Sequence, residues 1–349
     1  MTDPSTSSGR SLVPTREHTE LAGAVRTLLD KRSDSQAVRR AIEQPSGFDP
    51  DLWATLCDQI GVAALAIPEE HGGAGFTLAE THVVLEELGR TLTPSPLLAS
   101  VVATEALLAA GHHEPLGRIA EGAVTTVVGS GVTTDDGKLH GSADAVLYGD
   151  VADILVVAGG DGLYVVDSEA GGLTRTRLIG MDLTLGFARL DFDGVEAVAI
   201  TEDASPALAA AHRAGTLATT ALAVGCAQRG LDMTVAYTKE REQFGRPIGS
   251  FQALKHRMAE MLVRVQMSRA GAWAAVQAHV HGAPNADRLV AAAASYGSEA
   301  AMHVAAETVQ LHGGIAITWE HDAHLVFKRA QALHQLFGLP HHLRAALIS

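Results

Sequence analysis

Residues 241–247, Arg-Glu-Gln-Phe-Gly-Arg-Pro, interrupt a long helical pattern with side chains that could bind an anion. The Arg241 guanidinium can hold an anionic group through two parallel hydrogen bonds. Gly245 and Pro247 supply turn chemistry that stops the helix and exposes the neighbouring side chains. Taken alone, the segment also fits an exposed, ion-paired helix end, the commoner fate of such charges. Phe244 likewise fits a plain core position.

A second group of residues that could do chemistry, here metal binding, is a set of histidines near the C-terminal end of the sequence: His312, His321, His324, His334, His341 and His342. His321 and His324 have i,i+3 spacing, but a metal site needs two or more further ligands in good geometry. No flanking Cys or Glu-x-x-His pattern supplies them, so we expect no metal. The Gly-rich residues 69–76 lack the strand-before, helix-after context of a dinucleotide or phosphate loop, and we expect a turn there.

The elements that position these residues begin with a helical zone over residues 17–122, where apolar side chains recur at helical spacing. Residues 77–80, Thr-Leu-Ala-Glu, form a predicted capping box, with Gly89 as the stop of that helix. Asp51 is predicted to cap a helix that ends at Gly61. An N-terminal α-helical domain follows from this pattern.

Short runs of β-branched and apolar residues separated by Gly and Asp replace this pattern over residues 123–205. Examples are Val-Thr-Thr-Val-Val-Gly and Gly-Leu-Tyr-Val-Val-Asp. Residues 187–193 alternate with a period of two, as in a half-buried strand. We predict a small antiparallel β domain.

The helical period returns over residues 206–349. Four long helices are predicted, over 206–242, 250–281, 287–311 and 319–337. Their short connections favour an up-down four-helix bundle. The predicted fold class is mainly α with a small β domain between the two helical parts.

Composition narrows the classes of function. The 349 residues carry a formal net charge of -14, which argues against a nucleic-acid backbone as the main partner. The two cysteines, Cys57 and Cys226, suit a reducing cytosol and form no disulfide framework. Residues 1–16 are polar without an apolar signal region and are predicted to be a disordered tail. Residues 214–227 are apolar but too short to span a membrane. A cytoplasmic location follows as an expectation.

Three motifs resemble the acyl-CoA dehydrogenase family of flavoenzymes, over nearly the whole chain. They are the Pro-Glu-x-x-Gly-Gly turn and Glu-Leu-Gly helix within 61–90, the signature at 241–261, and Gln-Leu-His-Gly-Gly with its following helix at 310–330. The resemblance implies FAD, an electron-transfer flavoprotein as acceptor, and α,β-dehydrogenation of an acyl-CoA thioester. In that chemistry a base removes the α proton, the β hydrogen leaves as hydride to the flavin, and polarisation of the thioester carbonyl does much of the work.

The resemblance also implies which residues would meet the FAD of a neighbouring subunit across a dimer contact. Arg241 would bind the pyrophosphate, Gln243 would form a hydrogen bond nearby, and Phe244 would pack against the cofactor. The residues expected at the adenine end are Gln310, Gly313 and Gly314, with Gln252 a weaker candidate for the same region. The two glycines also fit an ordinary helix C-cap.

The catalytic residue is unknown because the family's glutamate is missing. Gly338 stands where the commonest position of that glutamate should be, and the alternative position on the first bundle helix falls near Gly215 or Thr216. His212 is a candidate titrating substitute, but an ordinary histidine at the surface or at a helix end is the preferred interpretation.

The β zone also departs from the family pattern. It lacks the Thr-Glu-Pro and Trp-x-Thr segments that embrace the flavin ring, and Val146 to Tyr148 stand roughly in their place. The chain therefore resembles the shorter, base-lacking subunit of actinobacterial heteromeric acyl-CoA dehydrogenases, which pairs with a longer catalytic subunit in a tetramer. A self-sufficient homotetramer with an atypical base stays open, as does a flavin-free structural or acyl-CoA-binding subunit.

Overall fold

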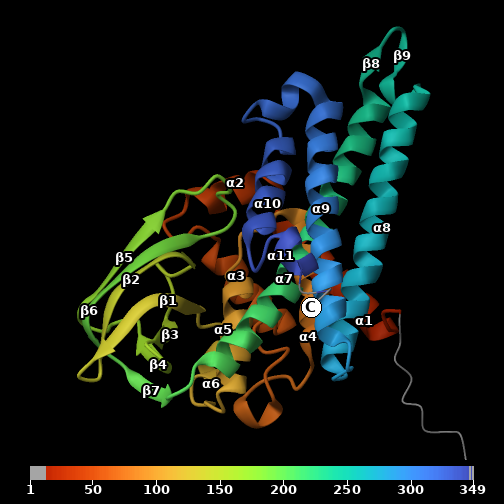
Figure 1. Ribbon diagram of the computed structural model, residues 1–349. Helices are drawn as coiled ribbons and strands as arrows, with labels where there is room; N and C mark the ends of the chain where they lie inside the picture. The colour runs from red at the N-terminus through yellow and green to blue at the C-terminus, as the bar shows by residue number, and fades with distance from the viewer. Residues whose placement is uncertain (1–12, 346, 348–349) are drawn as a thin grey trace, which may run out of the picture.

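The computed structural model describes residues 13–345 and 347. A helical N-terminal part, a β domain and a long C-terminal helical bundle follow each other along the chain, with the β domain at the left and the bundle at the right of Figure 1. The predicted fold class, mainly α with one small β domain, is confirmed. Most of the predicted tail lies outside the described residues.

The N-terminal helices are α1 (Arg16–Arg32), α2 (Ser35–Glu43), α3 (Pro50–Ile60), α4 (Leu78–Thr91), α5 (Leu97–Ala109) and α6 (Leu116–Ala120), with a 3-10 turn η1 (Glu69–His71). The Thr77–Glu80 capping box at the start of α4 is confirmed. The predicted cap at Asp51 is wrong: Asp49 caps α3, because Pro50 occupies the first helical position.

Gly89 does not end α4, contrary to the prediction, because the helix continues to Thr91. A side chain at Gly89 would overlap the backbone carbonyl of Leu222 on the neighbouring bundle helix. Gly89 therefore serves close packing between two helices.

The β domain is one seven-stranded sheet in the order β5-β6-β2-β1-β3-β4-β7. Its strands are β1 (Thr125–Asp135), β2 (Lys138–Leu147), β3 (Ile154–Gly159), β4 (Gly162–Asp167), β5 (Leu173–Leu178), β6 (Phe187–Glu196) and β7 (Val198–Thr201). The prediction of an antiparallel domain holds for every neighbouring pair except β1 and β3, which run parallel in the middle of the sheet.

The C-terminal part consists of α7 (Ser205–Glu240), the short strands β8 (Glu242–Gln243) and β9 (Arg246–Pro247), η2 (Ile248–Ser250), α8 (Gln252–Val280), α9 (Ala286–His312), η3 (Gly313–Ile317), α10 (Ala323–Gln335) and α11 (Pro340–Ala345). The helix α7 packs against α4 and α5 as well as α9 and α10, so it joins the two helical parts. The fourth bundle helix begins later than predicted, because η3 and a turn occupy residues 313–322.

A buried ion pair fastens the β domain to the bundle. The Arg329 guanidinium on α10 is 1% exposed and lies 3.1 Å from a carboxylate oxygen of Asp182. It also donates hydrogen bonds to the hydroxyl and the carbonyl of Thr184, at 2.7 and 2.9 Å. The loop before β6 is thus held against α10 by a fully desolvated charge.

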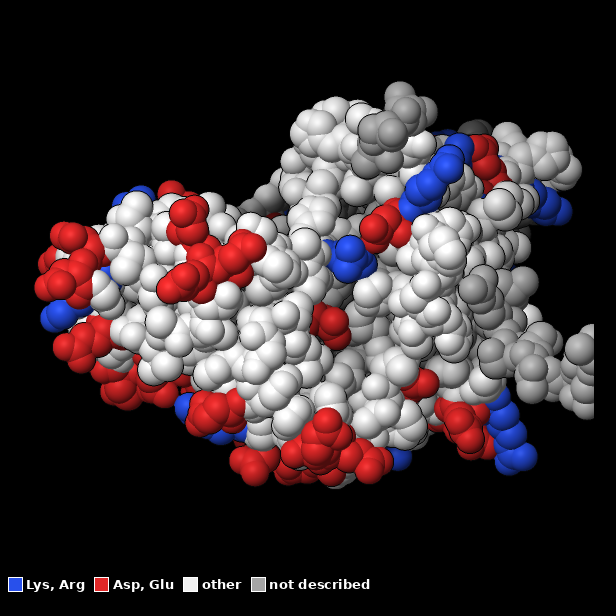
Figure 2. Space-filling model, turned by 60° about the horizontal axis from the view of Figure 1, so that its bottom comes forward, with Lys and Arg blue, Asp and Glu red and all other residues white. Residues whose placement is uncertain are grey.

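Acidic side chains dominate the face seen in Figure 2, where they gather most densely over the β domain at the left. Among the described residues, no helix combines the length and the apolar content needed to cross a bilayer.

Candidate functional site

The break predicted at residues 241–247 is a β-hairpin that projects from the end of α7 at the top of Figure 1. Gln243 pairs with Arg246, and the turn between them consists of Phe244 at φ 55° and Gly245 at φ 76°. Two successive residues with positive φ are the signature of the type I′ turn, which matches the twist of a two-residue hairpin. The helix stops because the chain reverses here.

Phe244 is 91% exposed, so the reading of this residue as part of the core is wrong. Its ring meets Phe251 edge to face at 6.1 Å, and the Arg246 guanidinium lies 4.1 Å above the Phe251 ring. A bulky side chain in the left-handed region carries a conformational cost that Asn or Gly avoids. Within the described chain, burial does not offset that cost, and the contact with Phe251 offsets only part of it.

The charged and polar side chains of the hairpin have few partners. No ion pair or side-chain hydrogen bond to Arg241 occurs within residues 13–345, so the ion-paired helix end considered from the sequence does not form there. The Gln243 amide donates to the Glu242 carbonyl at 2.8 Å, and the Gln252 amide lies 2.9 Å from the His256 ring. Arg241 is an exposed cation available to an external anion.

The other predicted cofactor residues lie at the end of α9, beside the end of α7. The rings of Tyr237 and His312 stack there at 4.5 Å, which fixes the two helix ends together. Gln310 is exposed, and Gly313 has φ 65°. An added Cβ at Gly313 or Gly314 would find no atom within 4 Å, so both backbones face open space. All seven predicted positions therefore gather at one end of the bundle.

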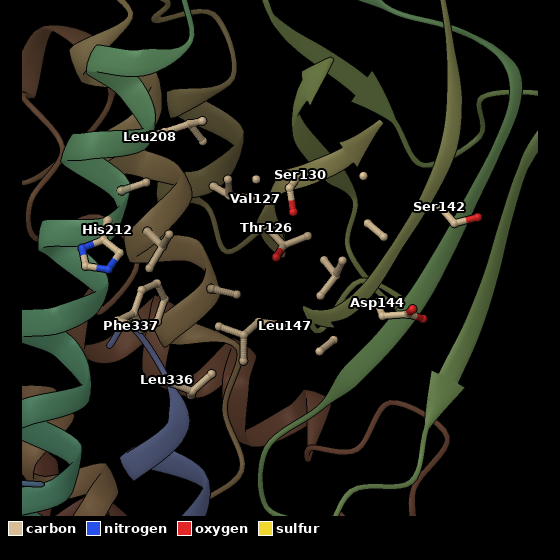
Figure 3. A pocket seen from close by; sticks show the side chains of 18 residues that line it. Thr126, Val127, Ser130, Ser142, Asp144, Leu147, Leu208, His212, Leu336 and Phe337 are labelled. Carbon is tan, nitrogen blue, oxygen red and sulfur yellow. The ribbon is translucent and has the colours of Figure 1, made fainter. Parts of the chain in front are cut away.

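A cavity of about 450 Å³ opens between the β domain and the other end of α7 (Figure 3). Its walls come from β1, β2, α5, α7 and the segment after α10, and include Val127, Asp144, Leu208, His212 and Phe337. His212 and Arg241 are 29 positions apart, which corresponds to about 40 Å of helix at roughly 1.5 Å per residue. The hairpin of one chain cannot reach the cavity of the same chain.

No carboxylate stands at either family position for the base. Gly338 has φ 116°, and Gly215 faces the Phe337 ring so closely that a Cβ there would overlap it. The Thr216 hydroxyl donates to the His212 carbonyl at 2.8 Å. Phe337 therefore fills the space next to Gly215, whereas Leu343 lies nearest to an added Cβ at Gly338. The sequence context of Phe337 gave no reason to predict this role.

His212 lines the cavity wall, and its ring meets Phe337 edge to face at 6.0 Å. Partial burial, with a smaller effect of the neighbouring Arg213 charge, lowers the pKa of His212. A lowered pKa keeps the imidazole neutral at pH 7, in the state that can accept a proton.

Residues 146–148, which stand in place of the missing flavin-ring motifs, have side chains in two different environments. Val146 and Leu147 line the cavity, whereas Tyr148 is fully buried outside the cavity lining, with its ring edge to face with Phe48. Tyr148 has φ 50°, and its backbone N–H donates to the Gly186 carbonyl at 3.0 Å. The cavity thus presents aliphatic side chains at this point.

Comparison with known proteins gives concordant matches. Residues 15–121 match the acyl-CoA dehydrogenase N-terminal domain, and residues 211–340 match the acyl-CoA dehydrogenase C-terminal domain. The acyl-CoA dehydrogenase IpdE2 of Mycolicibacterium smegmatis is 44% identical over 321 residues, which cover 92% of this chain and 94% of that protein.

Two solved structures are similar over almost their whole length. The ChsE4-ChsE5 complex from Mycobacterium tuberculosis contains a chain with a TM-score of 0.85 and 29% identity, matched over 97% of both chains. A variant of the Tcur3481-Tcur3483 steroid ACAD matches with a TM-score of 0.85 and 30% identity, over 95% of this chain and 96% of the other.

Proposed function

Because the chain belongs to the acyl-CoA dehydrogenase family, we propose that it works as one subunit of a heteromeric, FAD-dependent acyl-CoA dehydrogenase. In this proposal the hairpin and the end of α9 bind the FAD of a longer neighbouring subunit, which supplies the base. The observation that carries the proposal is the separation of two sites. The predicted cofactor residues lie at one end of α7, about 40 Å of helix from the cavity of the same chain, where both base positions are glycine or threonine.

The hairpin fits an anionic, partly aromatic cofactor by its chemistry. Arg241 is an exposed guanidinium without a partner in the described chain, and it suits the diphosphate of FAD through paired hydrogen bonds. Phe244 supplies an exposed ring, and Gly313 and Gly314 present backbone with nothing in front of it. When bound, the flavin accepts the β hydrogen of the acyl group as hydride. The role of this chain is to hold the cofactor and to orient it.

Two relatives by structure support the heteromeric assembly, since both are named as pairs of unlike chains. We further propose a cytoplasmic location and an electron-transfer flavoprotein as the electron acceptor, as the family resemblance implies. The acyl-CoA substrate would bind mainly at the longer subunit, because neither base position of this chain carries a carboxylate and Phe337 crowds the one at Gly215.

The test is to purify the chain alone and together with a longer dehydrogenase encoded beside it, and to measure flavin absorbance and turnover. We expect flavin and turnover only in the co-purified complex. Within that complex, Arg241→Ala should weaken FAD binding by about 10- to 150-fold, since a hydrogen bond to a charged group is worth roughly 1.5–3 kcal/mol. The matched control is Arg16→Ala, which removes an equal charge from a side chain that is 91% exposed. Equal FAD retention in the two variants contradicts the assignment.

A second candidate is favoured by one observation, the position of His212 in the cavity wall. If the chain alone carries stoichiometric FAD and turns over an acyl-CoA, and His212→Gln abolishes that turnover, the chain is a self-sufficient homotetramer. If neither preparation contains flavin, the chain is a structural or acyl-CoA-binding subunit.

A further inference from the structure

We propose that three packed rings, Tyr237, His312 and His321, form a proton-dependent clamp that holds the cofactor site in place while both imidazoles are neutral. We call these three residues the ring clamp. They come from the end of α7, the end of α9 and the turn before α10. The inference rests on the proposed function and adds a form of regulation to the same site. The three residues act as positioning residues, through the cofactor residues next to them.

The ring clamp is joined directly to the predicted cofactor residues on both sides. Tyr237 lies in the last turn of α7, and its carbonyl accepts a hydrogen bond from the Arg241 N–H at 2.8 Å. His312 is the last residue of α9 and is followed by Gly313. The rings of Tyr237 and His312 stack with their centroids 4.5 Å apart and their planes at 29°. A displacement of either ring therefore moves the hairpin relative to the glycine turn.

Hydrogen bonds assign a neutral tautomer to each imidazole. His312 Nδ1 lies 2.7 Å from the Thr308 carbonyl, which can only accept, so Nδ1 carries the proton. Its Nε2 is buried and forms no hydrogen bond in the described part of the chain. His321 Nδ1 accepts from the Ala323 N–H at 3.1 Å, so the proton of that ring is on Nε2. The packing thus fits two neutral rings.

The surroundings of His312 disfavour an imidazolium. The residue is 4% exposed, and burial lowers its pKa. The nearby His321 lowers that pKa as well, against opposing effects of the Thr308 and Met233 carbonyls. The two imidazole centroids are 4.6 Å apart, so a charge on one ring opposes a charge on the other.

The charged groups around His321 do not compensate for a proton. Burial lowers the pKa of His321, Asp322 opposes this effect, and Arg229 and Arg39 add to it. Asp322 is itself ion-paired with Arg39 at 2.7 Å and with Arg229 at 3.2 Å, so its charge is already balanced. Tyr237, which faces both imidazoles, carries no charge near neutral pH.

Acidification therefore acts against the packed arrangement of the three rings. Because both pKa values are lowered, a proton taken up below about pH 6.5 favours arrangements in which the imidazole is hydrated. The stability of the packed arrangement is fully present above that pH and is lost as the pH falls. We expect the complex to hold FAD at neutral pH and to bind it more weakly in acid.

The first test measures FAD binding to the complex by fluorescence titration between about pH 7.5 and about pH 5. His312→Phe keeps a stacked ring that takes up no proton, and His321→Asn keeps an acceptor for the Ala323 N–H. On acidification, the FAD dissociation constant should rise about threefold more in the wild type than in the double variant. Each single variant should show an intermediate rise, which keeps the test available if the double variant does not fold.

The matched control is His281→Asn, which removes an exposed histidine that follows α8 at the other end of the bundle (Figure 1). Its pH profile should equal that of the wild type. Tyr237→Ala opens the stack without removing an imidazole, and it should weaken FAD binding at about pH 7.5 by about 2- to 10-fold. Circular dichroism at each pH confirms that the compared proteins are folded.

A second test needs no cofactor. The amides of Arg241 and Ile248 are hydrogen-bonded at the base of the hairpin, and their hydrogen exchange can be followed in the isolated chain. After correction for the intrinsic pH dependence of exchange, their protection should fall on acidification about threefold more in the wild type than in the double variant.

Equal pH profiles in the wild type and the double variant would overturn the proposal. FAD affinity that increases on acidification only when the two histidines are present would also overturn it, because an imidazolium would then bind the diphosphate directly. FAD that binds at about pH 7.5, with the same pH dependence in all variants, rejects the ring clamp and leaves the proposed function standing. A complex without FAD at any pH rejects the proposed function, and the ring clamp with it.

Discussion

Phe244→Asn should have opposite effects on the isolated chain and on the complex. Phe244 occupies a left-handed turn position, φ 55°, with 91% of the residue exposed. The substitution places Asn before Gly245, and Asn-Gly is the pair that type I′ turns favour. The isolated chain should therefore become more stable, while FAD binding in the complex becomes weaker.

The magnitudes follow from the contacts of the ring. Left-handed backbone costs a bulky residue roughly 1–2 kcal/mol, which Asn largely avoids. The lost edge-to-face contact with Phe251 is worth about 0.5–1.5 kcal/mol at most. The isolated chain should gain up to about 1.5 kcal/mol in its free energy of unfolding. In the complex, a ring buried against the cofactor contributes about 2 kcal/mol, so the FAD dissociation constant should rise about 30-fold.

Urea unfolding of the isolated chain and fluorescence titration of FAD into the complex measure the two effects. Gly245→Ala is the matched control, because it strains the same turn at φ 76° and keeps the ring. It should destabilise the isolated chain by roughly 1 kcal/mol. If Phe244→Asn destabilises the isolated chain, or leaves FAD affinity unchanged, the reasoning about the hairpin is wrong.

The remaining predictions concern the interior. Burial raises the pKa of Glu105 to about 7 against an opposing effect of Arg213, so the folded state holds this proton longer than the unfolded state and stability falls as pH rises from about 4.5 to about 7. Glu105→Gln should therefore stabilise the chain at pH 8 by at most about 3 kcal/mol and have little effect near pH 4, as urea unfolding at both values will show. Arg329→Met should cost about 3–5 kcal/mol by leaving Asp182 buried without its cation, measured in the same way. Gly215→Ala should cost about 1–3 kcal/mol because it overpacks against Phe337, and much less in a Phe337→Ala background, which a double-mutant cycle will measure.

Elements with strong local signals could be predicted from the sequence. The Thr77–Glu80 capping box and the end of α3 at Gly61 depend on neighbouring residues alone, and both are confirmed. The prediction that α4 ends at Gly89 was wrong. Glycine is a common helix stop, but here it permits α4 to approach the Leu222 carbonyl on α7. Only the packing of a distant helix decides between the two roles.

The sequences of β2, β5 and β7 have no alternating or apolar pattern long enough to predict a strand. β5 and β7 are the two edges of the sheet, so each pairs on one side only, and β5 carries the largely polar sequence Leu-Thr-Arg-Thr-Arg-Leu. β2 contains a register shift between Ala143 and Val146, with Ala145 at φ 57°, which breaks the alternation of inward and outward residues. Sequence periodicity fails where a strand is exposed or irregular.

The candidate site shows the same limit. The seven predicted cofactor positions could be proposed because they lie in motifs that resemble those of the family. The space next to Gly215 is filled by Phe337, which lies 122 residues later. The hairpin reversal was visible as a break, yet the positive φ of Phe244 was not. The family motifs predict the binding residues, and tertiary packing determines what the cavity lacks.

The two ends of α7 differ in what they contribute to the stability of the isolated chain. At the cavity end, Phe337 packs against Gly215, with apolar side chains nearby and no buried carboxylate at the base positions. These contacts lie within one chain and stabilise its fold without a partner. At the hairpin end, an exposed aromatic residue sits in a strained turn beside a cation without a partner in the described chain, and neither feature stabilises the chain alone. Residues that cost stability persist most readily where they gain contacts elsewhere. We therefore propose that the functional contribution of this chain lies at the hairpin, where another molecule would supply those contacts.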